Sequence, residues 1–415
     1  MKRALLTIAV ASFAALSSAS AQTFELKPKK IKLNNGNAEV FPELELRVQG
    51  SLSGVESEPK YKSKTPQKFT TNFGGDDGVD VTFATDEKKG SGKGFDSLIA
   101  DLKGTGNLKK GKKLSGKPVR RGTNYEDTVF PAFKLKYDAG EDTEDYSIQA
   151  RLSVSRTSIT DKTPSDSTLY LTSLSCLEGK VELAGEKQKM VVFDANCNGV
   201  FGERGSNGRA GSKVSGDKIW VGKASTKIED SYIASLPLGK YFLFDGKYFE
   251  ISIGDNCMAE IKEATVPLGK IKVSQPGFLL ELREGSDVLY VSNSEGDELD
   301  IPTGDYKITT PGFRRKGKGG IWELQGETGS LNMDFDVSEG ELTEIEVGPP
   351  LKLVCTSTMR REGTGHSISL KFWIEGSQGE KYKYLRKNGQ RVKLPSVSIR
   401  NEKGKEVKKG SFEYG

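Results

Sequence analysis

The chain has 415 residues, 35% of them hydrophobic, with 48 glycines and 15 prolines. This composition is typical of a globular protein with many turns, and the length suits roughly three to four domains rather than one β-sandwich. The formal net charge is only +5, which does not indicate a nucleic-acid-binding protein. A single histidine excludes zinc sites that need two or three histidine ligands.

Residues 1–21 have the pattern of an export signal. Lys2 and Arg3 precede the apolar run Ala4–Leu16, and Ala19–Ala21 supplies the small residues that a signal peptidase accepts. Cleavage before Gln22 removes two cations and lowers the formal charge from +5 to +3. An uncleaved anchor is the weaker alternative because the run is short, and no later run approaches the length of a transmembrane helix. We therefore expect bacterial-type export and an extracytoplasmic protein, either periplasmic or secreted.

Alternation of apolar and polar residues, the period of a half-buried strand, continues to about residue 265. Strands are expected at Leu44–Val48, Val79–Phe83, Ser97–Ala100, Phe133–Tyr137, Tyr146–Val154, Leu169–Leu174, Val181–Leu183, Lys240–Phe244 and Lys247–Ile253. Asp245-Gly246, between the last two, is a strong hairpin signal. The pattern predicts an all-β protein of tandem antiparallel β-sandwich or barrel-like domains, of which the first two span residues 22–130 and 131–265.

A basic segment lies between Leu102 and Arg121, with eight basic residues and no acidic one. Such a charge run is most often only solvated, but it can also attract a cell-surface polysaccharide, an anionic envelope polymer or a lipid headgroup. The candidate polyanion-binding residues are Lys109, Lys110, Lys112, Lys113, Arg120 and Arg121.

The most specific stretch is Met190–Val221, in which an apolar run leads into Asp194-Ala195-Asn196-Cys197-Asn198-Gly199. This loop resembles the calcium loop of EF-hand and dockerin-like modules, with oxygen side chains at alternate positions and glycine at the sixth. The resemblance covers eight residues and implies bound Ca²⁺. The implied ligands are Asp194, Asn196, Asn198 and the Val200 carbonyl, with further oxygens from Glu203 and Asp217.

The twelfth position of the loop departs from the family pattern, because Gly205 stands where a bidentate glutamate belongs. Only one certain carboxylate remains, so we expect weak affinity, on the order of 0.1 to 1 mM. The alternative is an Asx-turn that holds no ion, with the side chains of Asp194, Asn196 and Asn198 bonded to neighbouring amides.

Asp101–Leu108 aligns with Asp194–Phe201 at the first-position aspartate, the sixth-position glycine and the eighth-position apolar residue. This indicates a degenerate internal repeat, with a chance match as the alternative. Lys103 occupies a would-be ligand position, so the first copy is expected to be metal-free.

Four cysteines, at positions 176, 197, 257 and 355, allow three complete disulfide pairings in an oxidising compartment. A bridge between Cys197 and Cys257 is a weak preference, and four buried thiols are the alternative.

Beyond Val266 the expected strands are short and regularly spaced, as in a sandwich. They are Gly269–Val273, Gly277–Arg283, Val288–Val291, Asp300–Tyr306, Ile321–Leu324 and Glu341–Val347. Ile301–Tyr306 resembles the segment that enters a strand in prealbumin-like, carboxypeptidase-regulatory-type modules, so residues 266–348 are expected to form one. Such modules act as spacers or as adhesion and carbohydrate-associated domains.

Gly348-Pro349-Pro350 is typical of a stiff linker. Residues 349–415 are expected to form an Ig-like unit that is truncated, because another strand begins at Ser411–Gly415. As a whole, the chain resembles exported bacterial multi-β-domain proteins with calcium-type loops.

No catalytic residue can be assigned. The only histidine, His366, lies in a turn-like context, and no Gly-x-Ser-x-Gly or phosphate-loop motif occurs. The first hypothesis is therefore a non-catalytic extracytoplasmic protein that serves in binding, adhesion or envelope structure. A carbohydrate-active enzyme that uses two carboxylates is the alternative, since such enzymes need no other group. A scaffold with neither ion nor ligand is the third.

Overall fold

The computed structural model describes residues 21–412 apart from 33–42, 50–53, 76–77, 91–93, 122–123, 139–142, 158–163, 206–215, 229–230, 232–234, 255, 286, 294–297, 328, 332, 363–364, 389 and 394. The described chain is nearly all β, in several mainly antiparallel sheets, which confirms the predicted fold class. The expected export signal lies outside the described residues except for Ala21.

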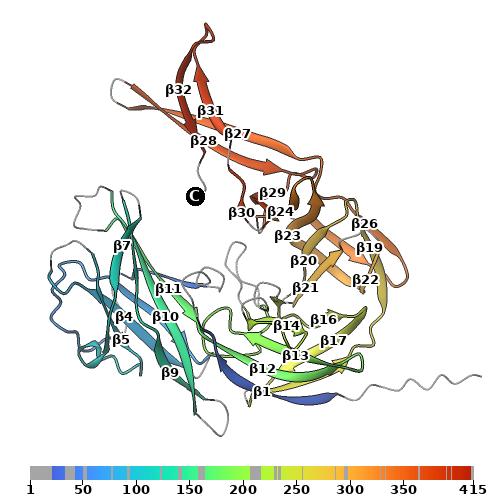
Figure 1. Ribbon diagram of the computed structural model, residues 1–415, viewed down its shortest axis with the longest axis horizontal. Coiled ribbons are helices and arrows are strands. Elements are labelled where there is room, and N and C mark those ends of the chain that lie inside the picture. The colour runs from blue at the N-terminus through green and yellow to red at the C-terminus, as the bar shows by residue number, and fades with distance from the viewer. Residues whose placement is uncertain are drawn as a thin grey trace, which may run out of the picture.

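The first part of the chain forms two sheets (Figure 1). The four-stranded sheet has the order β3-β4-β5-β6, and the six-stranded sheet has the order β2-β11-β10-β8-β7 with β9 also paired to β10. Their strands are β2 Glu43–Arg47, β3 Lys68–Phe73, β4 Val79–Asp86, β5 Ser97–Asp101, β6 Lys112–Ser115, β7 Lys117–Arg121, β8 Tyr125–Val129, β9 Phe133–Asp138, β10 Thr143–Ser155 and β11 Asp166–Ser173. A short 3-10 turn, η2 Leu108–Lys110, precedes β6.

An eight-stranded sheet follows, and the first strand of the chain lies inside it. Its order is β15-β14-β13-β12-β1-β18-β17-β16. The strands are β1 Gln22–Lys30, β12 Ser175–Leu183, β13 Glu186–Phe193, β14 Lys218–Gly222, β15 Leu236–Pro237, β16 Tyr241–Phe244, β17 Lys247–Ile253 and β18 Met258–Glu263. One half of β1 pairs with β12 and the other half with β18.

The three sheets share a single hydrophobic core, which runs from Leu26 to Ile261 in sequence. Phe69 and Phe83 from the four-stranded sheet, Tyr146 from the six-stranded sheet and Met190 from the eight-stranded sheet are all fully buried in it. The predicted boundary between residues 130 and 131 therefore crosses this shared core, and the division into two separate domains stays a prediction.

The next part of the chain forms a small sheet and a large one. The small sheet is β22-β19-β26, where β19 and β26 are parallel. The large sheet is β21-β20-β23-β24-β29-β28-β27, with β25 on β23 and β30 on β29. The strands up to the linker are β19 Leu268–Val273, β20 Phe278–Glu284, β21 Asp287–Asn293, β22 Leu299–Pro302, β23 Gly304–Gly317, β24 Gly320–Gly326, β25 Met333–Val337 and β26 Leu342–Ile345.

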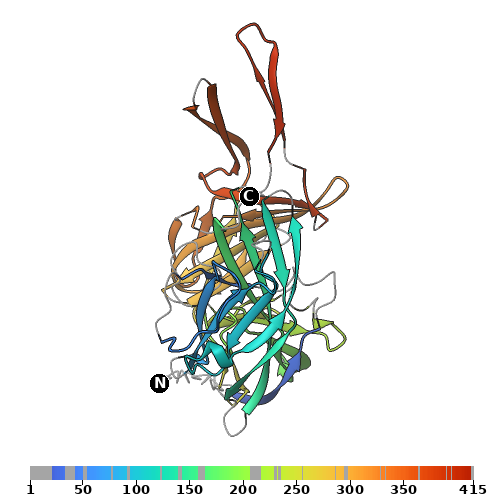
Figure 2. The same cartoon turned by 90° about the vertical axis from the view of Figure 1, so that its left-hand side faces the viewer.

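The last strands are β27 Lys352–Glu362, β28 Gly365–Glu375, β29 Lys381–Lys387, β30 Gln390–Arg391, β31 Ser396–Arg400 and β32 Glu406–Ser411. The β27–β28 and β31–β32 hairpins project from the body as two arms (Figure 2). Because β29 pairs with β24, the large sheet crosses the expected linker at Gly348-Pro349-Pro350. The expectation that the chain is truncated concerns residues outside the described part and stays a prediction.

Candidate metal centre

Asp194 begins the loop that follows β13, and its carboxylate is only 1% exposed. Its Oδ2 accepts hydrogen bonds from the Gly199 amide at 2.7 Å and from the Tyr146 hydroxyl, and its Oδ1 accepts one from the Asn198 amide at 3.3 Å. Tyr146 lies on β10 of the six-stranded sheet. Asp194 therefore joins its own loop to the six-stranded sheet by hydrogen bonds. We call residues 194–203 the Asp194 loop.

The side chains of the two loop asparagines form Asx-turn hydrogen bonds with the backbone. Asn196 Oδ1 accepts from the Asn198 amide at 3.3 Å, and Asn198 Oδ1 accepts from the Val200 amide at 3.0 Å. Both side-chain amides donate to Glu203 Oε2 at 2.7 Å. Cys197 and Gly199 have positive φ angles of 58° and 83°, which turn the chain around Asp194.

Asp217 lies beyond the loop, just before β14, and is 0% exposed. Its Oδ2 accepts the amide hydrogens of Gly202 at 2.6 Å and Glu203 at 3.2 Å. Its Oδ1 is buried and has no hydrogen-bond partner in the described structure. A buried carboxylate oxygen without a partner is costly, because the desolvation of the charge is not offset.

The two buried carboxyl groups affect each other. Burial raises the pKa of Asp194 to about 6, against the lowering effect of its bonds to Tyr146 and the loop amides. Burial also raises the pKa of Asp217 well above its ordinary value, and the negative charge of Asp194 raises it further. A positive charge placed between them would favour the ionised form of both carboxyl groups.

The Asp194 loop lies where the three sheets meet. The Asn198 carbonyl accepts from the Gly74 amide at 2.7 Å, at the end of β3. The Arg204 side chain donates to the Ile251 carbonyl of β17 at 3.5 Å, and the Leu238 amide donates to the Asp217 carbonyl at 2.8 Å. With Tyr146 on β10, these contacts tie all three sheets to one segment of about ten residues.

The oxygens around this loop suit calcium only in part. Calcium prefers six to eight hard oxygens, and Asp217 Oδ1, the loop carbonyls and Glu203 are of that kind. However, no group of three His, Cys, Asp or Glu side chains among the described residues is placed to hold a metal. The oxygens of Asp194, Asn196 and Asn198 also already accept hydrogen bonds, so a bound ion would add to an existing Asx-turn framework. Val200 takes part in this framework through its amide.

The Asp101 loop, residues 101–108, has the same backbone pattern as the Asp194 loop. Gly104 and Gly106, at the fourth and sixth positions, have φ angles of 60° and 70°, like Cys197 and Gly199 at the same positions. Asp101 accepts from the Lys103 amide at 3.3 Å, the Thr105 hydroxyl at 3.1 Å and the Asn107 amide at 3.1 Å. The eighth-position residues Leu108 and Phe201 are both buried. This agreement supports the predicted repeat.

The predicted polyanion-binding residues lie around two edge strands. Lys109 and Lys110 belong to η2, Lys112 and Lys113 to β6, and Arg120 and Arg121 to β7. All except Arg121, whose side chain is not described, are exposed. Since β6 and β7 are edges of their sheets, these cations also suit the common use of charge to prevent edge-to-edge aggregation.

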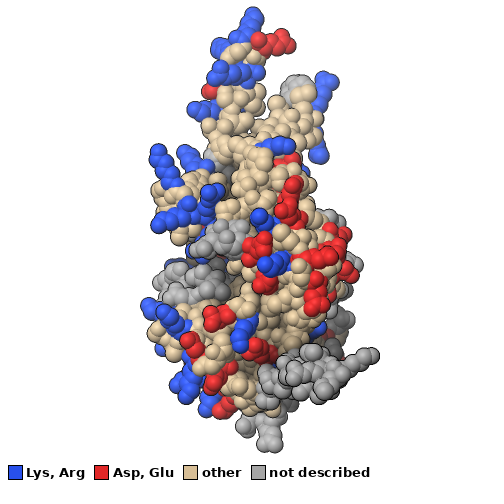
Figure 3. Space-filling view, turned by 90° about the vertical axis from the view of Figure 1, so that its right-hand side faces the viewer, with Lys and Arg blue, Asp and Glu red and all other residues tan. Residues whose placement is uncertain are grey.

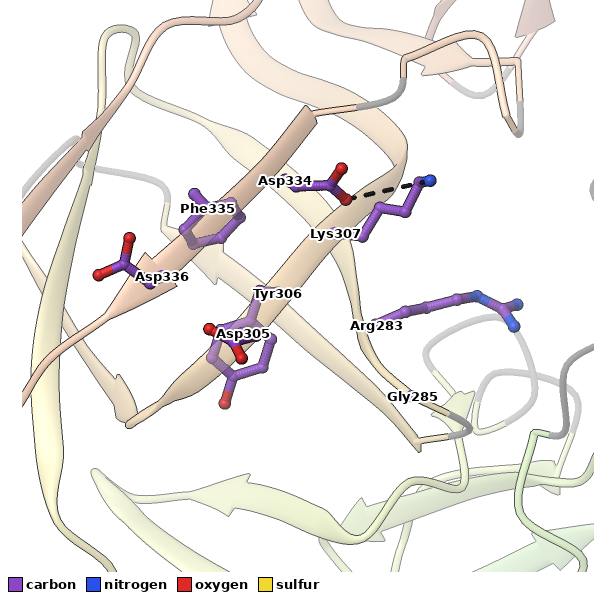
Figure 4. Close-up of a pocket in the computed structure, with 8 residues that line it drawn as sticks. All are labelled: Arg283, Gly285, Asp305, Tyr306, Lys307, Asp334, Phe335 and Asp336. Carbon is purple, nitrogen blue, oxygen red and sulfur yellow. Dashed lines mark ion pairs between the residues drawn. The ribbon is translucent and has the colours of Figure 1, made fainter.

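A groove of about 570 Å³ lies against β20, β23 and β25 (Figure 4). Tyr306 and Phe335 contribute an aromatic pair with ring centroids 5.9 Å apart. The rim carries the cations Arg283 and Lys307, and Lys307 approaches Asp334 at 4.0 Å. Asp305 and Asp336 are direct cross-strand partners, and both are exposed.

The structure records no disulfide bond at any of the four cysteines, all of which are described, so the expected bridge between Cys197 and Cys257 is not formed. Cys176, Cys197 and Cys257 are buried, and Cys355 is exposed. Burial raises the pKa of Cys176 to about 12, which leaves this thiol uncharged and unreactive at neutral pH.

Comparison with protein-family models, with curated proteins and with solved structures finds no match to this chain. Within the described residues, no helix has the length and apolar character needed to cross a membrane.

The metal-type loop and Asp217 were predicted from the sequence, but the part played by Tyr146 was not. Tyr146 was assigned only to the buried face of a strand. A tyrosine hydroxyl that is buried needs a polar partner, so its burial was a signal, yet nothing in the sequence names a partner 48 positions away.

Proposed function

We propose that the chain is a non-catalytic extracytoplasmic protein that serves in binding, adhesion or envelope structure, and that Ca²⁺ at the Asp194 loop stabilises its three N-terminal sheets. The observation that carries the calcium proposal is the unpartnered, fully buried Oδ1 of Asp217 beside a second buried carboxylate, Asp194. A divalent cation compensates both charges, and the loop oxygens supply the hard ligands that calcium prefers.

The extracytoplasmic location is supported by the export pattern of residues 1–21 and by the position of β1. The first described strand begins at Gln22, the residue expected to follow the cleavage site. N-terminal sequencing of the protein exported by a bacterial host tests this, and a mature N-terminus at Gln22 is the expected result. Retention of residues 1–21 in the mature protein contradicts it.

The calcium proposal predicts a modest gain in stability. With a dissociation constant of about 0.5 mM, about 10 mM calcium increases the free energy of unfolding by about 1.8 kcal/mol through mass action. Urea unfolding of the full chain, with and without calcium, measures this gain. Magnesium is the control cation, because it demands a smaller and more regular shell of ligands.

Asp217→Asn separates calcium binding from general salt effects. The variant keeps the shape of the side chain and removes the charge, so the calcium-dependent gain should vanish while stability without calcium is equal or higher. Asp101→Asn, in the loop predicted to be metal-free, is the matched control and should keep the full gain. The calcium proposal is wrong if the unmodified protein shows no gain, or if Asp217→Asn keeps it.

The carboxylate-dependent enzyme remains the second candidate, and the groove in Figure 4 is the place that favours it. Asp305 and Asp336 are direct cross-strand partners on β23 and β25 and both line the groove, and most glycoside hydrolases act with a pair of carboxylates. Both carboxyl groups are exposed, which weighs against the role of general acid, because a general acid needs a desolvated site that keeps it protonated. Release of reducing sugar from a panel of polysaccharides, lost in both Asp305→Asn and Asp336→Asn, would favour this candidate.

A further inference from the structure

The C-terminal part of the chain carries a large excess of positive charge. Residues 351–415 contain fifteen lysines and arginines and six glutamates. Preceding them, residues 333–350 contain six acids and no base. Lysine and arginine side chains are prominent on the projecting arms, and acidic side chains gather on the flank of the body below them (Figure 3). The molecule therefore presents an electropositive end.

Apart from these arms, the ends of the β23–β24 and β29–β30 hairpins form a basic cluster, which we call the double-hairpin tip and define as residues 314–322 with 386–388. Asn388, with φ 53°, directly follows β29, and its backbone amide donates to the Ile321 carbonyl at 2.8 Å. Its Oδ1 accepts from the Ile321 amide, also at 2.8 Å. This reciprocal pair joins the end of β29 to the start of β24.

The register of the strands places an aromatic ring between two cations. Trp322 is the direct cross-strand partner of Arg315 on one side and of Lys387 on the other. Direct partners in an antiparallel pair point to the same face of the sheet. The cations that flank Trp322 are thus two strand spacings apart, about 10 Å between backbones.

Contacts within the tip hold the row formed by Arg315, Trp322 and Lys387 in place. The Lys387 ammonium lies 5.0 Å from the centre of the Trp322 ring. The Trp322 indole donates to the Lys318 carbonyl at 3.4 Å, which fixes the ring against the turn. Lys318 and Arg315 are exposed, while Trp322 and Lys387 are half-buried.

The positive charge of this row is not neutralised within the described part of the chain. Arg314 forms an ion pair with Glu323 at 3.1 Å, but these two residues lie on the other face of the hairpin. No described carboxylate lies within 4.0 Å of the charged nitrogens of Arg315, Lys318 or Lys387. Such a row of cations beside an aromatic ring can bind an anionic ligand.

We propose that the double-hairpin tip binds an acidic polysaccharide, with Arg315 and Lys387 contacting carboxylate or sulfate groups and Trp322 contacting the apolar face of a sugar ring. A polymer that repeats negative charges along its length matches cations spaced across a rigid sheet. A pyranose ring also has an apolar face, which a lone phosphate lacks. The expected export of the chain favours a polysaccharide over a nucleic acid. The site is separate from the Asp194 loop and from the basic segment at 102–121.

Binding of a polygalacturonate oligosaccharide to the full chain, measured by titration calorimetry at low salt, tests the proposal, with neutral dextran as the reference sugar. Arg315→Ala/Lys387→Ala should raise the dissociation constant about a hundredfold, since each charge-assisted contact contributes about tenfold. Trp322→Ala should weaken binding by about tenfold. Trp322→Phe keeps an aromatic ring and should retain most of the affinity of the unmodified chain.

Lys29→Ala/Lys30→Ala is the matched control, because it removes the same charge from exposed positions on β1 and should leave affinity within about twofold. Thermal unfolding of each variant shows whether the fold is retained. Equal losses in both double variants, tight binding of dextran, or preference for a single-stranded oligonucleotide would overturn the proposal. Self-association at low salt that the tip substitutions abolish would also overturn it, because the surface would then bind a second copy of the chain.

Discussion

The Tyr146 hydroxyl donates to Asp194 Oδ2 inside the core, and this contact joins β10 to the Asp194 loop across 48 positions of sequence. Both side chains are buried, so the hydrogen bond satisfies two polar groups that water cannot reach. The same Asp194 oxygen accepts the Gly199 amide, and the two bonds together set the orientation of the carboxylate.

Tyr146→Phe should therefore destabilise the protein by about 1 to 3 kcal/mol, the usual cost of leaving a buried acceptor short of a donor. Urea unfolding measures the change. Tyr125→Phe is the control, because Tyr125 is 59% exposed and should tolerate the change within about 0.5 kcal/mol. Equal effects of the two substitutions would contradict the importance of the Tyr146 bond.

Gly199→Ala should cost more than the strain of a positive φ alone. The φ angle is 83°, and an added Cβ would lie 2.4 Å from the Phe73 ring, which the sheet holds in place. Gly246, at φ 73° with nothing within 4 Å, provides the comparison. Gly246→Ala should cost about 1 kcal/mol, and Gly199→Ala at least about 1 kcal/mol more. Similar losses measured by urea unfolding would show that Phe73 moves aside.

Asp101→Ala should destabilise the four-stranded sheet by about 2 kcal/mol or more, because the carboxylate accepts bonds from three loop residues. Since the Asp101 loop is predicted to be metal-free, calcium should stabilise this variant as much as it stabilises the unmodified chain. Differential scanning calorimetry with and without calcium checks both statements. A calcium response lost in Asp101→Ala would move the site to the first loop of the repeat.

The stability of the chain should depend on the ionisation of Glu126. Burial raises the pKa of Glu126 above 4.5, although Arg156, 3.7 Å away, acts in the opposite direction. A carboxyl group with a raised pKa holds its proton more tightly in the folded state, so the folded state loses stability as the pH rises above about 4.5. Glu126→Gln should remove this part of the pH dependence.

The difference in unfolding free energy between Glu126→Gln and the unmodified chain, followed from about pH 4 to pH 7, isolates this contribution from other groups. The substitution also removes the partner of Arg156. This loss adds to the difference in unfolding free energy, and the change of that difference with pH reports the ionisation of Glu126. A difference that does not change with pH would show that Glu126 is ionised throughout.

Only one of the four thiols should react rapidly with a soluble disulfide reagent in the folded, reduced protein. Cys355 is exposed on β27, whereas Cys176, Cys197 and Cys257 are buried. Cys355→Ser should leave no rapidly reacting thiol, and unfolding in denaturant should reveal the other three. Fast reaction of two or more thiols in the native protein would contradict the burial.

Local signals in the sequence were sufficient for much of this fold. The Asp245-Gly246 hairpin is confirmed, with both residues at positive φ between β16 and β17, because the turn depends only on its own residues. The alternation in Tyr146–Val154 likewise predicted β10, whose alternate residues are buried. The loop at Asp194 was predicted from the spacing of its oxygens.

Contacts between distant segments could not be predicted in the same way. No residue pattern shows that β29 continues the sheet of β24, because pairing of strands depends on the whole arrangement. The double-hairpin tip was missed for this reason. Its lysines and arginines form two short runs, Arg314–Lys318 and Arg386–Lys387, which lie far apart in the sequence and are brought together only by the register of β23, β24 and β29.

The position of β1 has a consequence for the time course of folding. Gln22 pairs with Ile261, about 240 positions later, and Leu26 pairs with Gly179. The eight-stranded sheet cannot be completed until both partner strands have been synthesised, so β1 stays without its partners during most of the translation of the chain. Long-range pairing of this kind slows folding, and a holding chaperone that keeps β1 from pairing elsewhere should raise the yield of refolded protein.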